Sequence, residues 1–173
     1  MTDKTPHPAR FRVAHLNPRQ ATEFSLAPDG AARAALAARL GIKALPRLSF
    51  AGQIRAVEGD AWQVAGQLEA RVVQPCVVTL APVSTDLHEK IHRTFSPHVT
   101  IPEGDEAEMP DDEHEPLGQF IDLAEIMAEE LILALPLYPR ADGASLAPPP
   151  AEQETRKPFS GLADLLKDSG KKP

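Results

Sequence analysis

Residues 120–139 read FIDLAEIMAEELILALPLYP, and this stretch decides the fold. Five side chains follow helical spacing within it: Leu123, Ile126, Met127, Glu130 and Leu131. Asp122 can cap the start of a helix, with Glu125 three residues later as its capping-box partner. Pro136 cannot continue a helix, because it lacks the backbone N–H. The pattern therefore predicts a helix over residues 122–135.

The last turn of this predicted helix, residues 131–135, is apolar on every side. A helix that is apolar all round has to be covered all round. The core of the domain could cover one side, and a partner or the C-terminal piece of the chain could cover the other. A helix buried in a single core explains the remaining pattern without any function, so both interpretations stay open.

Upstream, the sequence predicts one strand, one helix and then several strands. Residues 11–16 alternate and predict a short first strand. Residues 29–40 are rich in alanine, and Gly41 is a natural C-cap, so a first helix is predicted there. Between residues 42 and 100, short alternating segments with breaks between them are typical of strands. These are strands over 47–50, 62–68 and 70–79, a hairpin turn at 58–60 and a break at 82–85.

Residues 86–95 fit two structures, because Leu87, Ile91 and Phe95 share one face of either a helix or a strand. Flanking antiparallel strands favour the strand. The expected fold class is α+β. An antiparallel curved sheet or partly open barrel over residues 10–100 packs against the helices at 29–40 and 122–135.

The chain divides on composition into a domain and a tail. Residues 1–140 are predicted to form a single domain with an acidic loop at 103–115. Residues 141–156 form a proline-rich linker, and residues 157–173 form a short amphipathic segment. That segment is too short for a stable isolated helix, so we expect it to dock on its own domain or on a partner.

Composition narrows the class of protein. A single cysteine, Cys76, excludes a disulfide scaffold, and no stretch is apolar enough for a signal peptide or a membrane span. We therefore expect a cytoplasmic protein without a membrane partner. Residues 1–100 hold 12 basic and 8 acidic side chains, a balance of +4, whereas residues 101–173 hold 6 and 17, a balance of −11. The basic excess could face RNA, although an ordinary mixed surface explains it as well.

The run from residue 121 to residue 136 resembles the signature of the YceD family, the large ribosomal RNA subunit accumulation proteins of bacteria and plastids. The residues that carry this resemblance are Asp122, Leu123, Glu130, Leu131, Leu133, Leu135 and Pro136. A second match lies near the end of the chain, where Pro158 and Phe159 are followed by Leu162 and Leu165. With a looser match around Cys76, the resemblance covers roughly the whole chain.

The resemblance implies a ribosome biogenesis factor that supports accumulation of large-subunit (23S) ribosomal RNA. Its partner would be precursor ribosomal RNA or the assembling large subunit. The resemblance implies no catalytic activity and no cofactor, and we expect no small-molecule substrate. The alternative is an interaction module or chaperone for a basic ribosomal protein, without contact to RNA, which the acidic balance of residues 101–173 favours.

The sequence departs from the family pattern in its cysteines. Many members carry a Cys-x-x-Cys pair where this chain has Val73 and Cys76, and some have cysteines after the helix, where this chain has none. A metal role is therefore not carried over, and Cys76 is expected to be a small buried core residue. His88 and His92 would lie about 13 Å apart on a strand, too far for one ion, so no metal site is expected.

Phosphate contacts require arginine or lysine side chains. The arginines on or next to predicted strands are Arg10, Arg12, Arg47, Arg55, Arg71 and Arg93. The main candidates for RNA contact among them are Arg47, Arg55, Arg71 and Arg93. Aromatic residues make up 5% of the chain, too few for a base-stacking platform. The acidic helix at 122–135 is better interpreted as scaffold or protein interface.

Overall fold

The computed structural model of the chain describes residues 9–58, 60–99 and 114–145. The chain divides into two compact units, Met1–Gly143 and Ala144–Pro173. The predicted C-terminal segment lies outside the described residues, as do the linker beyond residue 145 and the acidic loop up to residue 113. The architecture below is that of the first unit.

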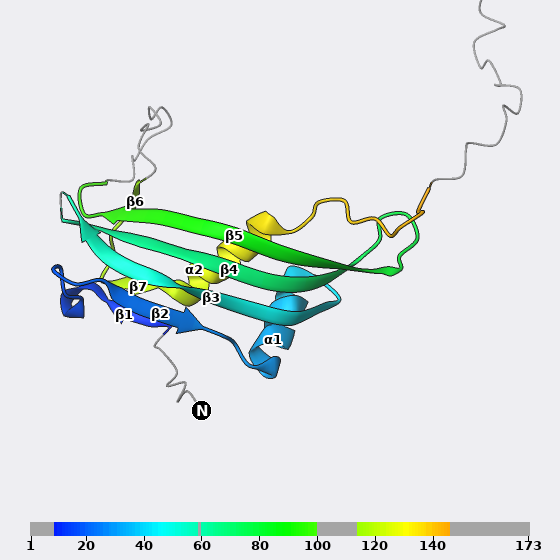
Figure 1. The fold of residues 1–173 in the computed structure, drawn as a ribbon, viewed down its shortest axis with the longest axis horizontal. Coiled ribbons are helices and arrows are strands. Elements are labelled where there is room, and N and C mark those ends of the chain that lie inside the picture. The colour runs from blue at the N-terminus through cyan, green and yellow to red at the C-terminus, as the bar shows by residue number, and fades with distance from the viewer. Residues whose placement is uncertain (1–8, 59, 100–113, 146–173) are drawn as a thin grey trace, which may run out of the picture. The chain divides into compact units, whose positions relative to one another are not determined.

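Five strands form the main sheet, in the order β2-β3-β4-β5-β6 (Figure 1). Their bounds are Thr22–Leu26 for β2, Ala44–Val57 for β3, Ala61–Pro75 for β4, Pro82–Ser96 for β5 and His114–Pro116 for β6. Neighbouring strands are antiparallel except β5 and β6, which are parallel. The α+β class and the antiparallel curved sheet are confirmed. The sheet does not close on itself, so the barrel alternative is not confirmed.

A second, two-stranded sheet pairs β1 (Arg10–Arg12) with β7 (Phe120–Asp122). The predicted first strand over residues 11–16 is therefore only partly right, because residues Val13–His15 form a 3-10 helix, η1. The backbone N–H of Val13 donates to the carbonyl of Gln119, and η1 follows directly. The short partner β7 leaves nothing for a longer β1 to pair with.

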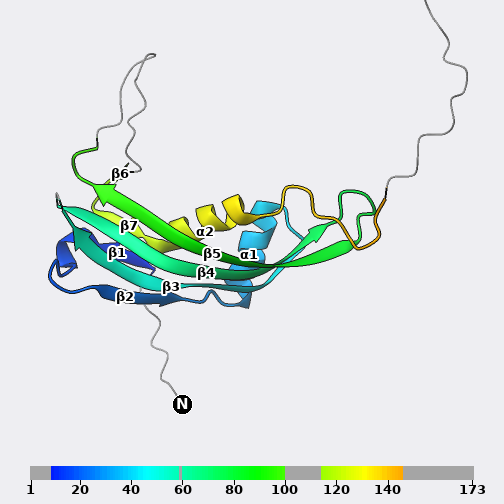
Figure 2. The same cartoon turned by 45° about the horizontal axis from the view of Figure 1, so that its top comes forward.

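Both predicted helices are present, and both pack on the same face of the main sheet (Figure 2). Helix α1 spans Gly30–Leu40 and ends at Gly41, whose φ of 66° is left-handed. Helix α2 spans Leu123–Ala134. The carboxylate of Asp122 caps α2 by accepting hydrogen bonds from the N–H groups of Ala124 and Glu125.

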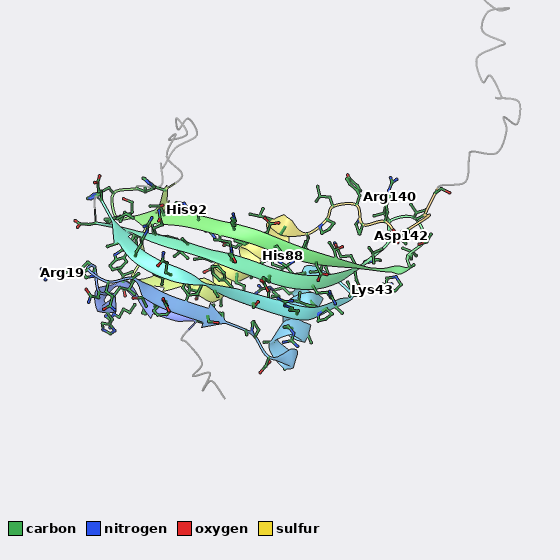
Figure 3. All side chains as sticks on the ribbon, viewed as in Figure 1. Arg19, Lys43, His88, His92, Arg140 and Asp142 are labelled. Atoms are coloured by element: carbon green, nitrogen blue, oxygen red, sulfur yellow. The ribbon has the colours of Figure 1, made fainter. Side chains whose placement is uncertain are left out.

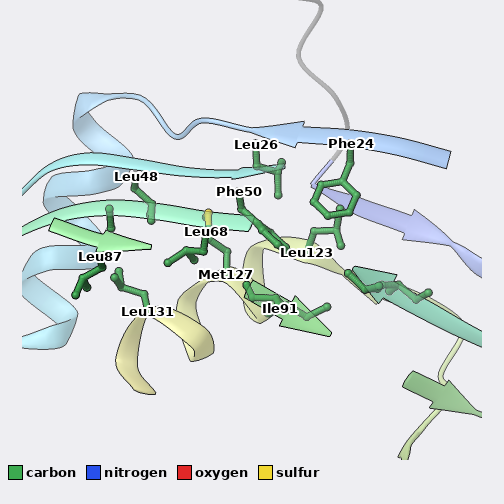
Figure 4. Close-up of a cluster of buried hydrophobic side chains, with 14 of the residues drawn as sticks. Phe24, Leu26, Leu48, Phe50, Leu68, Leu87, Ile91, Leu123, Met127 and Leu131 are labelled. Carbon is green, nitrogen blue, oxygen red and sulfur yellow. The ribbon is translucent and has the colours of Figure 1, made fainter. Parts of the chain in front are cut away.

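The core fills the space between α2 and the inner face of β3, β4 and β5 (Figure 4). Side chains at every second position of these strands point inward. Phe50 and Leu68 of the strands and Leu123 of α2 have no exposed surface. Phe24 of β2 meets Phe50 edge to face, with ring centroids 4.8 Å apart. Among the described residues, both helices pack on this one face, and neither covers the opposite face of the three long strands.

Several predicted boundaries are wrong. The predicted break at residues 82–85 lies inside β5, and the chain turns instead between Cys76 and Ala81, whose N–H and C=O groups are hydrogen-bonded. The predicted strand over residues 70–79 accordingly stops at Pro75. β2 was not predicted. Residues 114 and 115, placed in the acidic loop, belong to β6, where ladder pairing with β5 outweighs the acidic composition.

Two glycines allow the central strands to approach closely. Gly52 of β3 is paired with Gly66 of β4. A Cβ atom added at Gly52 would lie 2.1 Å from the carbonyl oxygen of Ala65, and one at Gly66 would lie 2.6 Å from that of Ala51. Both contacts are with backbone atoms, which cannot move without disturbing the ladder.

We expect Gly66→Ala to lower the free energy of unfolding by about 1–3 kcal/mol, because the new methyl group overpacks the strand pair. Gly118→Ala is the matched control, since its Cβ would meet nothing closer than 3.8 Å. Urea unfolding of the two variants measures the difference. Equal stability of the two variants would contradict the close approach of the strands.

Candidate functional site on the outer face of the sheet

The outer face of the sheet is the face turned away from α2, and it is mainly polar. Strand alternation and register place the side chains of Arg47, Arg55 and Arg71 on this face. Lys90 of β5 joins them, because it lies opposite Gln67 on the outward-pointing positions of β4. Three of the four main candidates for RNA contact therefore share one surface.

Each outer-face arginine has a polar neighbour. Arg47 pairs with Glu69. Arg71 makes two hydrogen bonds of 2.7 Å to the carboxylate of Asp86. These bonds raise the pKa of Arg71 and lower the pKa of Asp86. Arg55 donates from Nε to Oε1 of Gln63, 2.8 Å away.

These outer-face ion pairs contribute little to the stability of the fold. The side chains of Arg47 and Arg71 are 60% and 54% exposed. Solvent-exposed pairs of this kind contribute about 0–1 kcal/mol each. A phosphate group could therefore replace either carboxylate at little energetic cost, and both arginines remain available to an anionic ligand.

Arg93 differs from the other three candidates because it points to the inner face. Its guanidinium is 21% exposed and lies between β5, β6 and α2. It donates to Glu115 at 2.5 and 2.7 Å and to Glu129 at 2.5 Å, with Glu130 at 3.9 Å. Burial alone would lower the pKa of Arg93, but the hydrogen bonds to Glu115 and Glu129 outweigh it and raise the pKa.

Sequence reasoning placed Arg93 on a strand but missed its three carboxylate partners, which come from residues 22 to 37 positions away. The available signal was the strand period, which puts Arg93 on the same side as Ile91 and Phe95. A cation on the apolar side of a strand needs internal partners. Arg93 therefore joins β5 to β6 and α2 through ion pairs, and its guanidinium is already bound by carboxylates of the chain itself.

The two remaining arginines lie on β1, away from the outer face. The guanidinium of Arg10 lies 4.2 Å from the centroid of the Phe120 ring and 3.8 Å from the carboxylate of Asp122. Arg12 is exposed at the end of the strand. The structure therefore does not bring Arg10 and Arg12 together with the other candidates.

Most residues of the motif at 121–136 have structural roles. Leu123 and Leu131 are fully buried, and Leu135 packs against the core. The carbonyl of Pro136 accepts a hydrogen bond of 3.1 Å from Nε2 of Gln74. Leu133 is 79% exposed, so the described residues leave part of the apolar helix end uncovered. Pro158 and Phe159, which carry the second match, lie outside the described residues.

The side chain of Cys76 is buried, as predicted, and it also accepts hydrogen bonds. Backbone N–H groups of Val78, Thr79 and Ala141 lie 3.3–3.4 Å from its Sγ atom. The side chain of Thr79 and the N–H groups of Ala141 and Thr79 lower the thiol pKa to about 6, against the opposing effect of burial. The sulfur thereby links the turn after β4 to the segment after α2.

His88 and His92 lie on β5 and are exposed (Figure 3). Within residues 9–58, 60–99 and 114–145, no group of three or more histidine, cysteine, aspartate or glutamate side chains is placed to hold a metal ion. In the same part of the chain, no helix is long and apolar enough to cross a membrane.

The fold and this surface define a small α+β protein that buries one face of an open sheet under helices and presents the other as a polar platform. The model of one family, the large ribosomal RNA subunit accumulation protein YceD, matches residues 64–166. The chain belongs to this family, and the family description ties it to the accumulation of large-subunit ribosomal RNA. No curated protein and no solved structure matches the chain.

We expect Arg93→Gln to lower the free energy of unfolding by about 1–3 kcal/mol, because it leaves partly buried carboxylates without a cation. Arg71→Gln is the control, as it breaks an exposed pair and should change stability by less than about 1 kcal/mol. Urea unfolding at neutral pH separates the two. A larger loss from Arg71→Gln would contradict the cross-linking role of Arg93.

The Cys76 thiol gives the stability of the fold a pH dependence. Its pKa falls from the ordinary value of 9.0 to about 6 on folding. The thiolate therefore adds stability that is complete above pH 9 and is lost as the pH falls through about 6. The difference in unfolding free energy between the wild type and Cys76→Ala should grow from pH 6 to pH 9 in urea titrations. A difference independent of pH would exclude a thiolate in the folded protein.

Proposed function

We propose that this chain is a cytoplasmic, non-enzymatic biogenesis factor that supports accumulation of large-subunit ribosomal RNA by binding precursor RNA or the assembling large subunit. The family membership supports the pathway. The single observation that carries the mode of action is the placement of Arg47, Arg55 and Arg71 on the outer face of the sheet, with Arg47 opposite Arg71 and Arg55 farther along β3. The three guanidiniums span β3 and β4 and remain accessible.

Electrostatics favours this face over the rest of the described surface. Over β2 to β5, the outward positions carry four cations and three carboxylates: Arg47, Arg55, Arg71 and Lys90 against Glu23, Glu69 and Asp86. The remaining described residues hold eight basic and ten acidic side chains, a balance of −2. Anionic RNA would meet less repulsion on this face than the charge of the remaining described residues implies.

The polar groups between these cations suit a ligand with many hydrogen-bonding atoms. Outward-facing serine, glutamine, threonine and histidine side chains can donate to phosphate and ribose oxygens. Few aromatic residues are present for base stacking, so the proposed contact is with the backbone and shape of the RNA rather than with its sequence.

A pair of double variants tests the RNA face. Arg55→Ala with Arg71→Ala removes two outer-face cations, whereas Arg19→Ala with Arg140→Ala removes two exposed cations elsewhere (Figure 3). Fluorescence anisotropy with a large-subunit precursor RNA is recorded between about 50 and 200 mM salt. We expect only the first variant to weaken binding and to reduce the slope of log K against log salt by about 1.4–1.8.

Equal weakening by both double variants would mean that total charge, rather than this face, determines binding. Undetectable binding of the wild type at low salt would overturn direct RNA contact and favour the alternative, a carrier of a basic ribosomal protein. A deletion strain, complemented with wild type or with the first double variant, reports large-subunit RNA levels. Loss of this RNA in the deletion and its rescue by wild type alone are the expected results.

A further inference from the structure

A groove of about 860 Å³ lies between α1 and α2, on the opposite side of the sheet from the proposed RNA face. Its floor is apolar and includes Leu26, Leu36 and Met127. Ile132 of α2 also lines the groove, and its side chain is 49% exposed. The groove belongs to the first compact unit and is formed entirely by described residues.

The exposed isoleucine is not explained by the stability of the helix. The core positions of α2 are already filled by buried side chains one turn apart, including Leu123, Met127 and Leu131. A polar side chain at position 132 would leave those contacts intact. An apolar side chain at the mouth of an apolar groove suits contact with another apolar surface.

The walls of the groove differ in charge. The α2 wall carries three carboxylates, Asp122, Glu125 and Glu129, whereas the α1 wall carries one cation, Arg39. Glu125 is exposed, and no ion pair joins it to another described residue. Arg10 lies beside Asp122, and Arg93 is shared by Glu129, Glu115 and Glu130. With these partners counted, five carboxylates stand against three cations, so the groove and its surroundings keep a balance of −2, which repels phosphate groups and attracts cationic side chains.

We propose that this groove binds a cationic amphipathic helix of a partner protein, with apolar side chains on the floor and lysine or arginine side chains against the α2 wall. A groove between two helices with an apolar floor accepts helical segments through anchors at i, i+3 or i+4 and i+7. The charge of the rim selects basic segments over acidic ones. This inference stands independently of RNA binding, because it uses other residues on the opposite side of the sheet.

The probe is a fluorescent helical peptide of about 18 leucine and lysine residues, long enough to form a helix on binding. A peptide with glutamate in place of lysine tests the charge of the rim. We expect the full-length protein to bind the leucine–lysine peptide, and the leucine–glutamate peptide to bind about tenfold more weakly or not at all. Comparable binding of the two peptides would overturn the proposal.

Two variants locate the site. Ile132→Glu places a charge at the mouth of the groove, and Glu125→Lys reverses a charge of its rim; both positions are exposed. Each should weaken peptide binding about tenfold or more. Val77→Glu is the matched control, since Val77 is 47% exposed and lies outside the groove. Unchanged urea midpoints show that the variants fold.

Nuclear magnetic resonance of isotope-labelled protein decides what occupies the groove. Contacts between the methyl groups of Ile132 and the peptide support the proposal. Contacts in the free protein between these methyl groups and its own residues from outside the groove would overturn it, as would a loss of binding in Val77→Glu equal to that in Ile132→Glu.

Discussion

The period-two alternation of β3, β4 and β5 is the constraint on which the remaining structure depends. These strands are 14 or 15 residues long and paired along nearly their whole length. Once α2 covers their inner side chains, every second side chain must face the other way. One face supplies the core, and the other supplies a broad polar surface. A register shift of one residue would exchange these two faces.

The same alternation explains why arginines on neighbouring strands have different roles. Arg71 faces outward and holds Asp86 in an exposed pair that adds little stability. Arg93 faces inward, where its charge requires carboxylates from β6 and α2. Acidic residues of the second half of the chain thus complete a site on the first half. Part of the acidic charge of residues 101–173 is therefore structural rather than available for a partner.

Helices and central strands could be predicted from the sequence, because local signals are strong there. Asp122 caps α2 as predicted, and the strand interpretation of residues 86–95 is confirmed. The N-cap of α1, Asp29, was not predicted. β2 was missed although Glu23, Phe24, Ser25 and Leu26 alternate between polar and buried apolar side chains, because a strand of five residues gives only a short signal. β6 pairs in parallel with β5, and the ion pair of Arg93 with Glu115 joins residues 22 positions apart, which no local pattern reveals.

For the candidate site, the sequence indicated which arginines lie on strands but not which face each would occupy. That depends on the register between β3 and β4, including the irregularity between Ala44 and Arg47. The groove between α1 and α2 could not be predicted from the sequence, because it forms between residues about 90 positions apart. The uncovered end of α2 was the one local sign of it, since residues 131–135 are apolar on every side.

Two properties of the Cys76 sulfur, its low pKa and its burial, have opposite effects on its reactivity. Its low pKa makes it a thiolate at neutral pH, the form that attacks electrophiles and oxidants. Its surface is fully buried beneath the turn after β4 and the segment that contains Ala141. A reagent can therefore reach the sulfur only when these two segments separate. The rate of thiol alkylation therefore measures how often the turn after β4 separates from the segment that contains Ala141. Cys76 is thus an internal probe of local unfolding.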